Sequence, residues 1–168
     1  SFGNQQIEAN SGIKKFMNLR EENITKSLLL WLENNSWKIL AFDFPQSGTG
    51  IILHPNEDIR ETKNKGSIIP DIIAIKDENV VFFENKDRYD GYDFEKVNLL
   101  RTENPYEKSI AKFLERYCYS NIYFGIGLPN TSNIRKKIDD KREMLDFALL
   151  VSSSRDIHIY YQSKLIFQ

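Results

Sequence analysis

The stretch PDIIAIKDENVVFFENK, residues 70–86, decides how this chain folds. Two apolar runs, at residues 72–75 and 80–83, flank a polar break at residues 76–79. This pattern predicts two adjacent antiparallel strands that are joined by a tight turn. If the turn is centred between Asp77 and Glu78, residue 75 lies opposite residue 80. Counting outward along the two strands, Asp71 then lies opposite Glu84.

This register gathers three charged groups at the ends of two apolar strands. Directly opposed side chains sit about 4.5–5.5 Å apart on one face, and Lys86 shares that face with Glu84 because strand side chains alternate. Opposed carboxylates repel, and burying them uncompensated is unfavourable. A divalent cation removes that penalty, and Mg²⁺ prefers oxygen ligands of this kind. Such an ion polarises a phosphate, and a neighbouring lysine stabilises the developing charge. The residues therefore predict metal-assisted hydrolysis of a phosphodiester.

Pro70-Asp71, the gap of twelve residues and Glu84-Asn85-Lys86 resemble the motif of the PD-(D/E)xK nuclease superfamily, which includes many type II restriction endonucleases. The resemblance implies Asp71 and Glu84 as metal ligands, together with the backbone carbonyl of Asn85, and Lys86 as the catalytic lysine. It implies Mg²⁺ as the cofactor, with Mn²⁺ able to substitute. The alternative interpretation is that Glu84 and Lys86 are ordinary polar residues at the end of a strand.

A further carboxylate is expected from the first helix, which the sequence predicts over residues 19–34. Glu21 and Glu22 lie in its first turn, where acids stabilise a helix through its dipole. Members of the superfamily often carry a metal-site acid on the helix that precedes the first core strand. We prefer Glu22 because residues 20–25 resemble the first-helix pattern of several such nucleases. Glu21, or neither residue, remains an alternative.

The remaining sequence predicts an α/β fold with a restriction-endonuclease-like αβββαβ core, in which helices flank a central mixed sheet. A chain of 168 residues is long enough for one sizeable core, so we expect a single domain over residues 1–168, with residues 1–18 as an N-terminal helical extension. Further strands are expected at residues 37–44, 51–53, 121–128, 147–151 and 157–161. Further helices are expected at residues 104–119 and 132–146.

The overall charge sets limits on the nucleic-acid partner. The net charge is −1 and the pI about 6.2, which excludes a generically basic protein that coats nucleic acids. A selective enzyme needs only a handful of phosphate and base contacts. We expect residues 46–65 and the loop 87–93 to flank double-stranded DNA. The expected phosphate contacts are Arg88, Lys63 and Lys65, and the expected groove readers are Gln46 and His54.

Other classes of function find little support in the sequence. It contains no P-loop, dinucleotide fingerprint or nucleophile elbow, and its two histidines and one cysteine lack zinc-ligand spacing. No secretory signal and no apolar stretch of about 18 residues is present, so we expect a cytoplasmic protein without a membrane partner.

The hypothesis is a Mg²⁺-dependent DNA endonuclease of restriction or phage defence, which implies a homodimer or a second nuclease subunit for a double-strand cut. Two alternatives remain. One is an inactive module of the same fold that binds nucleic acid or oligomerises. The other is a repair or transposition nuclease that acts on another DNA structure or on RNA.

Overall fold

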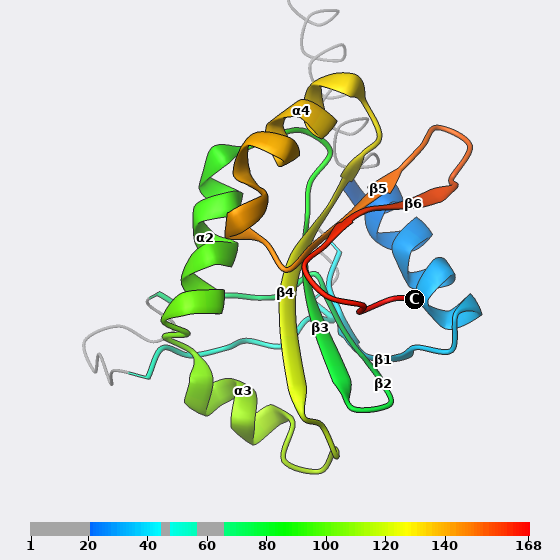
Figure 1. Ribbon diagram of the computed structural model, residues 1–168. Coiled ribbons are helices and arrows are strands. Elements are labelled where there is room, and N and C mark those ends of the chain that lie inside the picture. Colours follow the sequence, from blue (N-terminus) through cyan, green and yellow to red (C-terminus); the bar gives the residue numbers. More distant parts are fainter. Residues whose placement is uncertain (1–20, 45–47, 57–65) are drawn as a thin grey trace, which may run out of the picture.

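A six-stranded mixed sheet forms the centre of the computed structural model, which describes residues 21–44, 48–56 and 66–168 (Figure 1). The strands lie in the order in which they occur in the chain. The pairs β3–β4 and β4–β5 are parallel, and the other neighbours are antiparallel. The strands are β1 (Lys38–Phe42), β2 (Ile72–Lys76), β3 (Asn79–Asn85), β4 (Asn121–Pro129), β5 (Phe147–Val151) and β6 (Ile157–Gln162). The predicted α/β class with a mixed sheet is confirmed.

The β2–β3 hairpin has the register that the sequence predicts. Ile75 pairs with Val80 and Ile72 pairs with Phe83. Asp77 turns the chain with φ 53°, a left-handed conformation that aspartate tolerates better than most residues and that suits two-residue hairpins. The ladder ends at the pair of Ile72 with Phe83, with Asp71 directly before β2 and Glu84 directly after Phe83 in β3, so the two acids lie together at the open end of the hairpin.

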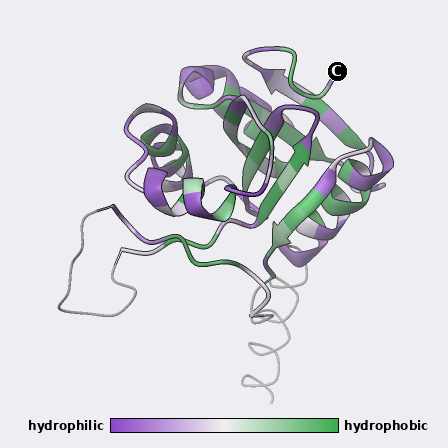
Figure 2. Cartoon of the chain, turned by 90° about the horizontal axis from the view of Figure 1, so that it is seen from below, coloured by the Kyte–Doolittle hydropathy of each residue, from purple (hydrophilic) through white to green (hydrophobic). Residues whose placement is uncertain are grey.

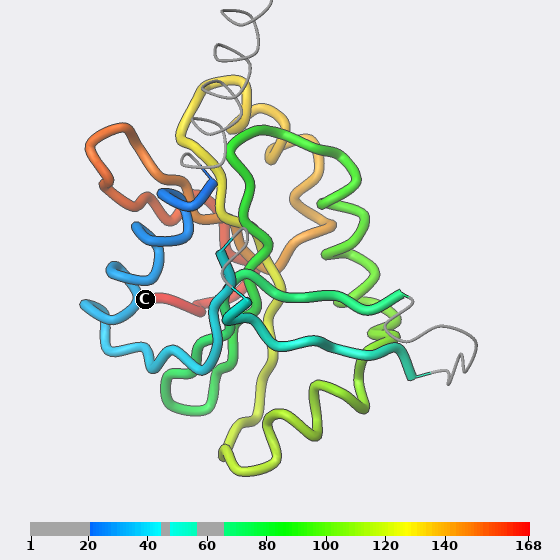
Figure 3. Tube along the Cα trace, turned by 180° about the vertical axis from the view of Figure 1, so that it is seen from behind, coloured from blue at the N-terminus to red at the C-terminus, as the bar shows by residue number. Residues whose placement is uncertain are grey.

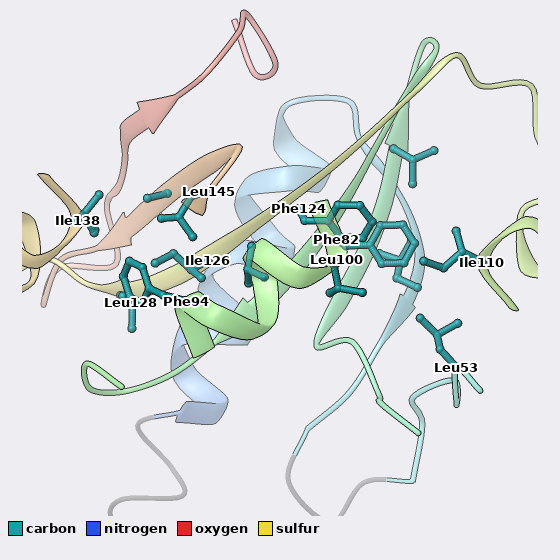
Figure 4. Close-up of a cluster of buried hydrophobic side chains, with 14 of the residues drawn as sticks. Leu53, Phe82, Phe94, Leu100, Ile110, Phe124, Ile126, Leu128, Ile138 and Leu145 are labelled. Carbon is teal, nitrogen blue, oxygen red and sulfur yellow. The ribbon is translucent and has the colours of Figure 1, made fainter. Parts of the chain in front are cut away.

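Helices cover both faces of the sheet, and each face buries its own hydrophobic cluster (Figures 1 and 2). The helix described over residues 21–34 and the C-terminal residues Ile166 and Phe167 pack on one face. The other face is covered by α2 (Gly91–Thr102), α3 (Glu107–Phe113) and α4 (Ser132–Lys141), and Figure 4 shows apolar side chains of this cluster. Side chains of β3 alternate between the two faces, so that Phe82 belongs to one cluster and Phe83 to the other.

Helix α2 corrects the prediction of a loop over residues 87–93. Asp90 caps the helix by accepting a 3.0 Å hydrogen bond from the backbone N–H of Tyr92, so only residues 86–90 separate β3 from α2. Helix α3 is shorter than expected: it ends at Phe113 instead of about residue 119. The connection from β3 to β4 therefore contains two helices where the sequence indicated one.

Smaller differences concern the ends of elements. Of the strand predicted at residues 51–53, only Leu53 pairs, in an isolated bridge with Ile68. The two extended segments that meet there run out past α2 and α3 (Figure 3). The late helix ends at Lys141 and is followed by a short 3-10 helix, Arg142–Met144. The predicted extension at residues 1–18 lies outside the described residues. Within the described ranges, no helix is long and apolar enough to span a membrane.

Candidate metal and phosphodiester site

Asp71 and Glu84 form the centre of the site, at the end of the β2–β3 hairpin. The backbone N–H of Asp71 donates a 3.1 Å hydrogen bond to the carbonyl of Phe83. The backbone N–H of Asn85 donates a 2.7 Å hydrogen bond to Oδ2 of Asp71. These bonds hold the Asp71 carboxylate against the end of β3, beside Glu84.

The two central carboxylates destabilise each other's charged forms. Burial and the nearby charge of Glu84 raise the pKa of Asp71 to about 8, against the opposing effect of the Asn85 hydrogen bond. Burial also raises the pKa of Glu84, although the Lys96 ammonium favours its charged form. Two partly buried acids whose charges are unfavourable together form an environment that attracts a cation.

The amine of Lys86 lies among four carboxylates, those of Glu21, Asp71, Glu84 and Asp93, which we call the carboxylate cluster. Burial lowers the pKa of Lys86, but the negative charges of these acids, Asp93 most strongly, raise it above its ordinary value. Lys86 is therefore a firmly charged ammonium, suited to stabilising negative charge and unsuited to acting as a base near neutral pH.

Helix α2 contributes two charged residues to the site that sequence reasoning missed. Nζ of Lys96 lies 3.3 Å from Oε1 of Glu84. Asp93 is only 6% exposed, and within the described residues its Oδ2 has no hydrogen-bond partner. The spacing Asp90-x-x-Asp93, with a capping residue followed by an acid in the first turn, was the available sequence signal for this helix.

The first helix presents Glu21 to the site instead of the preferred Glu22. Glu22 forms a partly exposed 3.1 Å ion pair with Lys26. Glu21 instead interacts electrostatically with Lys86, Asp87, Asp93 and Arg88, and burial raises its pKa. The structure thus favours the alternative that the sequence left open.

A buried hydrogen bond fixes this helix to the end of β3. Nδ2 of Asn85 donates to Oγ1 of Thr25 over 3.1 Å, and both residues are almost fully buried. Thr25 lies one turn after Glu21, so the two share a face of the helix. Gly127 on β4 makes room for the Asn85 amide, because a Cβ at that position would overlap Asn85 Oδ1 and Leu28.

The predicted DNA contacts are only partly described. Gln46, Lys63 and Lys65 lie outside the described residues. Arg88 is exposed and close enough to Glu21 to favour its charged form. His54 contacts Ser67 through its ring, and its backbone N–H donates to Ser109 of α3. These contacts place His54 beside α3 and not beside the carboxylate cluster.

The donor set at the strand ends suits a hard divalent cation. Over residues 21–44, 48–56 and 66–168, no group of three or more His, Cys, Asp or Glu side chains is close enough to hold a metal. Asp71 and Glu84 make two, and a backbone carbonyl such as that of Asn85 is a third oxygen donor. Mg²⁺ commonly binds through one or two carboxylates and retains several waters, so the residues present fit this ion.

Comparison with known proteins gives no independent assignment, because no protein-family model matches the chain and no curated protein matches its sequence.

Proposed function

We propose that this protein is a Mg²⁺-dependent endonuclease that hydrolyses DNA phosphodiester bonds. The observation that carries the proposal is the pair of partly buried carboxylates, Asp71 and Glu84, at adjacent strand ends, with the ammonium of Lys86 beside them. Two acids that repel each other weaken a purely structural ion pair, whereas a divalent cation bound between them removes the repulsion. The presence of all three groups also favours an enzyme over an inactive module of the same fold.

The order of elements supports the restriction-endonuclease-like core that the resemblance implies. A helix, three antiparallel strands, a helical connection and a parallel fourth strand follow one another from residue 21 to Pro129. In this arrangement β2 and β3 supply the motif residues, and the first helix supplies an additional acid. Glu21 is the acid that we propose for that role, because it interacts electrostatically with Lys86.

Each residue of the site has a separate role in the proposed reaction. Asp71, Glu84 and the carbonyl of Asn85 would hold Mg²⁺, with Mn²⁺ as a substitute, and the bound ion would supply Lewis-acid activation of a phosphate and of water. Lys86 stabilises negative charge that develops on the phosphate and orients the attacking water. Asp93 and Glu21 keep Lys86 charged, as its raised pKa indicates.

Under this proposal the substrate is double-stranded DNA. Arg88 is the one expected phosphate contact that lies among the described residues. A role in restriction or phage defence fits an enzyme of near-neutral net charge, because selective cutting relies on few contacts. A double-strand cut requires two active sites, which a homodimer or a second nuclease subunit provides. Under this proposal the protein acts in the cytoplasm.

Cleavage of plasmid and oligonucleotide DNA in Mg²⁺ or Mn²⁺ tests the proposal. The variants Asp71→Ala, Glu84→Ala and Lys86→Ala are each expected to lose cleavage while remaining folded. Glu78→Ala is the matched control, because Glu78 is an exposed acid at the opposite end of the same hairpin. Full activity in any of the three site variants would contradict the assignment, as would a wild-type protein that cuts equally well in a chelator.

A further inference from the structure

Where the end of β3 meets α2, each segment contributes one acid and one lysine, and each acid interacts with the lysine of the other segment. Glu84 in β3 and Lys86 directly after the strand are two residues apart, and Asp93 and Lys96 are three residues apart on α2, so each pair is expected to face one side. The Lys96 ammonium binds Oε1 of Glu84 at 3.3 Å. The neighbouring Asp93 carboxylate is 6% exposed and, in the part of the chain that the structure describes, has a buried Oδ2 without a hydrogen-bond partner.

Lys96 pairs with the Glu84 carboxylate, which is one of the proposed metal ligands. The Lys96 side chain is 25% exposed and that of Glu84 15% exposed, so the pair is partly shielded from water and its attraction is stronger than on an open surface. A divalent cation bound to Glu84 would bring two positive charges beside this ammonium. Metal and Lys96 therefore compete for the same carboxylate.

Once a metal has displaced it from Glu84, the Lys96 ammonium can contact another anion in the site. Lys96 is carried by the second turn of α2, and the helix fixes its Cα close to the carboxylate cluster. Lysine is a compact charge on a flexible stem, so it can turn from Glu84 toward an anion in the same site. The anion expected there is the phosphate of the bound DNA.

Resting on the proposed nuclease function, we infer that Lys96 is a second functional lysine: it neutralises Glu84 before metal binds, and it contacts a DNA phosphate once metal has bound. The first role predicts that Lys96 weakens metal binding. The second predicts that the same residue strengthens DNA binding. A lysine that only stabilises the fold would not act on the two ligands in opposite directions.

Two titrations on the full chain test this inference, with Ca²⁺ as the probe because it commonly supports association without cleavage. Lys96→Gln is compared with Lys112→Gln, which removes an exposed lysine of α3, and with Lys96→Arg, which keeps the charge. Calorimetry of Ca²⁺ binding without DNA is expected to show about three- to fivefold tighter binding in Lys96→Gln, the size of one partly exposed ion pair. Lys96→Arg and Lys112→Gln are expected to match the wild type.

The second titration measures duplex binding in Ca²⁺ at several salt concentrations. Lys96→Gln is expected to bind more weakly, with a salt slope lower by about one unit, and Lys96→Arg to restore both. If Lys96→Gln behaves like Lys112→Gln in either titration while the wild type binds metal and cleaves DNA, this inference alone is overturned. A wild-type protein that binds no divalent cation overturns the proposed function, and the inference with it.

Discussion

Oγ1 of Thr25 accepts a 3.1 Å hydrogen bond from Nδ2 of Asn85, across 60 residues of sequence. The bond is buried and lies between the first helix and the end of β3. It fixes the turn of the helix that carries Glu21 to the strand residue whose neighbours are Glu84 and Lys86. The position of the first-helix acid is thus set by a contact between two uncharged side chains.

Thr25→Val is expected to lower stability by about 1–3 kcal/mol, because it leaves the Asn85 amide donor buried and unpaired. Denaturant unfolding measures this loss, and cleavage rates should fall with it as Glu21 loses its anchor. Thr102→Val is the matched control, since Thr102 makes an exposed hydrogen bond to Asn98, and exposed substitutions usually change stability by less than about 0.5 kcal/mol. Equal losses in the two variants would show that the Thr25 bond has no special role.

Glu21→Gln and Glu22→Gln separate the two candidate acids of the first helix. Glu21→Gln is expected to reduce metal affinity or cleavage by about 10- to 100-fold, as changes next to metal ligands commonly do. Glu22→Gln should lose only a partly exposed ion pair with Lys26 and retain activity. Steady-state cleavage and Ca²⁺ calorimetry give both values, and the reverse ranking would restore Glu22 as the functional acid.

Divalent cations are expected to raise the melting temperature of the protein. An ion that binds only the folded state stabilises it by about 2.7 kcal/mol at 100 times its dissociation constant. Asp71→Asn should melt at a higher temperature than the wild type in a chelator, because it relieves the repulsion with Glu84, and should respond less to Mg²⁺ or Mn²⁺. An undiminished response in this variant would place the ion elsewhere.

The stability of the metal-free protein is expected to fall as the pH rises from about 4 to about 8. The pKa of Asp71 is raised from 3.8 to about 8 in the folded state, so the folded protein binds the extra proton in this window and loses that advantage as the proton leaves. The raised pKa values of Glu84 and Glu21 act in the same direction. Thermal melts in a chelator should show a flatter pH profile for Asp71→Asn; parallel profiles would contradict the assignment of the pKa.

Arg88→Ala is expected to weaken duplex binding in Ca²⁺ about equally for all sequences and to lower the salt slope by about one unit. Arg88 is exposed three residues after the end of β3, and a contact with a phosphate carries no base information. Arg116→Ala removes an exposed arginine in the segment after α3 and serves as the control. Unchanged salt dependence in Arg88→Ala would exclude this docking of DNA.

The hairpin was predictable from the sequence because its signals are local. β-branched runs, a polar turn and a fixed count from the turn determine which residues oppose each other, and the structure has that register. The charged residues at its end could be recognised for the same reason, since their shared face follows from strand alternation. Whether they bind metal and cut DNA remains a prediction.

The sequence did not indicate that α2 contributes to the site, because the apolar pattern of this helix is interrupted. Its buried positions include Asp93 beside Phe94, Val97 and Leu100, while Leu99 is exposed. A charge stands where the helical period would place an apolar residue, and an apolar residue faces solvent. The choice between Glu21 and Glu22 was hidden for another reason: it depends on the rotation of a helix, which a distant contact, between Thr25 and Asn85, determines.

The crossed pairing of β3 with α2 also bears on when the protein acquires its chemistry. Lys96 follows the hairpin in the chain, so the Glu84 carboxylate gains the ammonium that neutralises it only when α2 has packed against the sheet. Asp93 and Lys96 both come from α2, so the charges of the site are complete only in the packed molecule. Under the proposed function, an incompletely folded chain is therefore a poor nuclease, which spares the DNA of the cell that makes it.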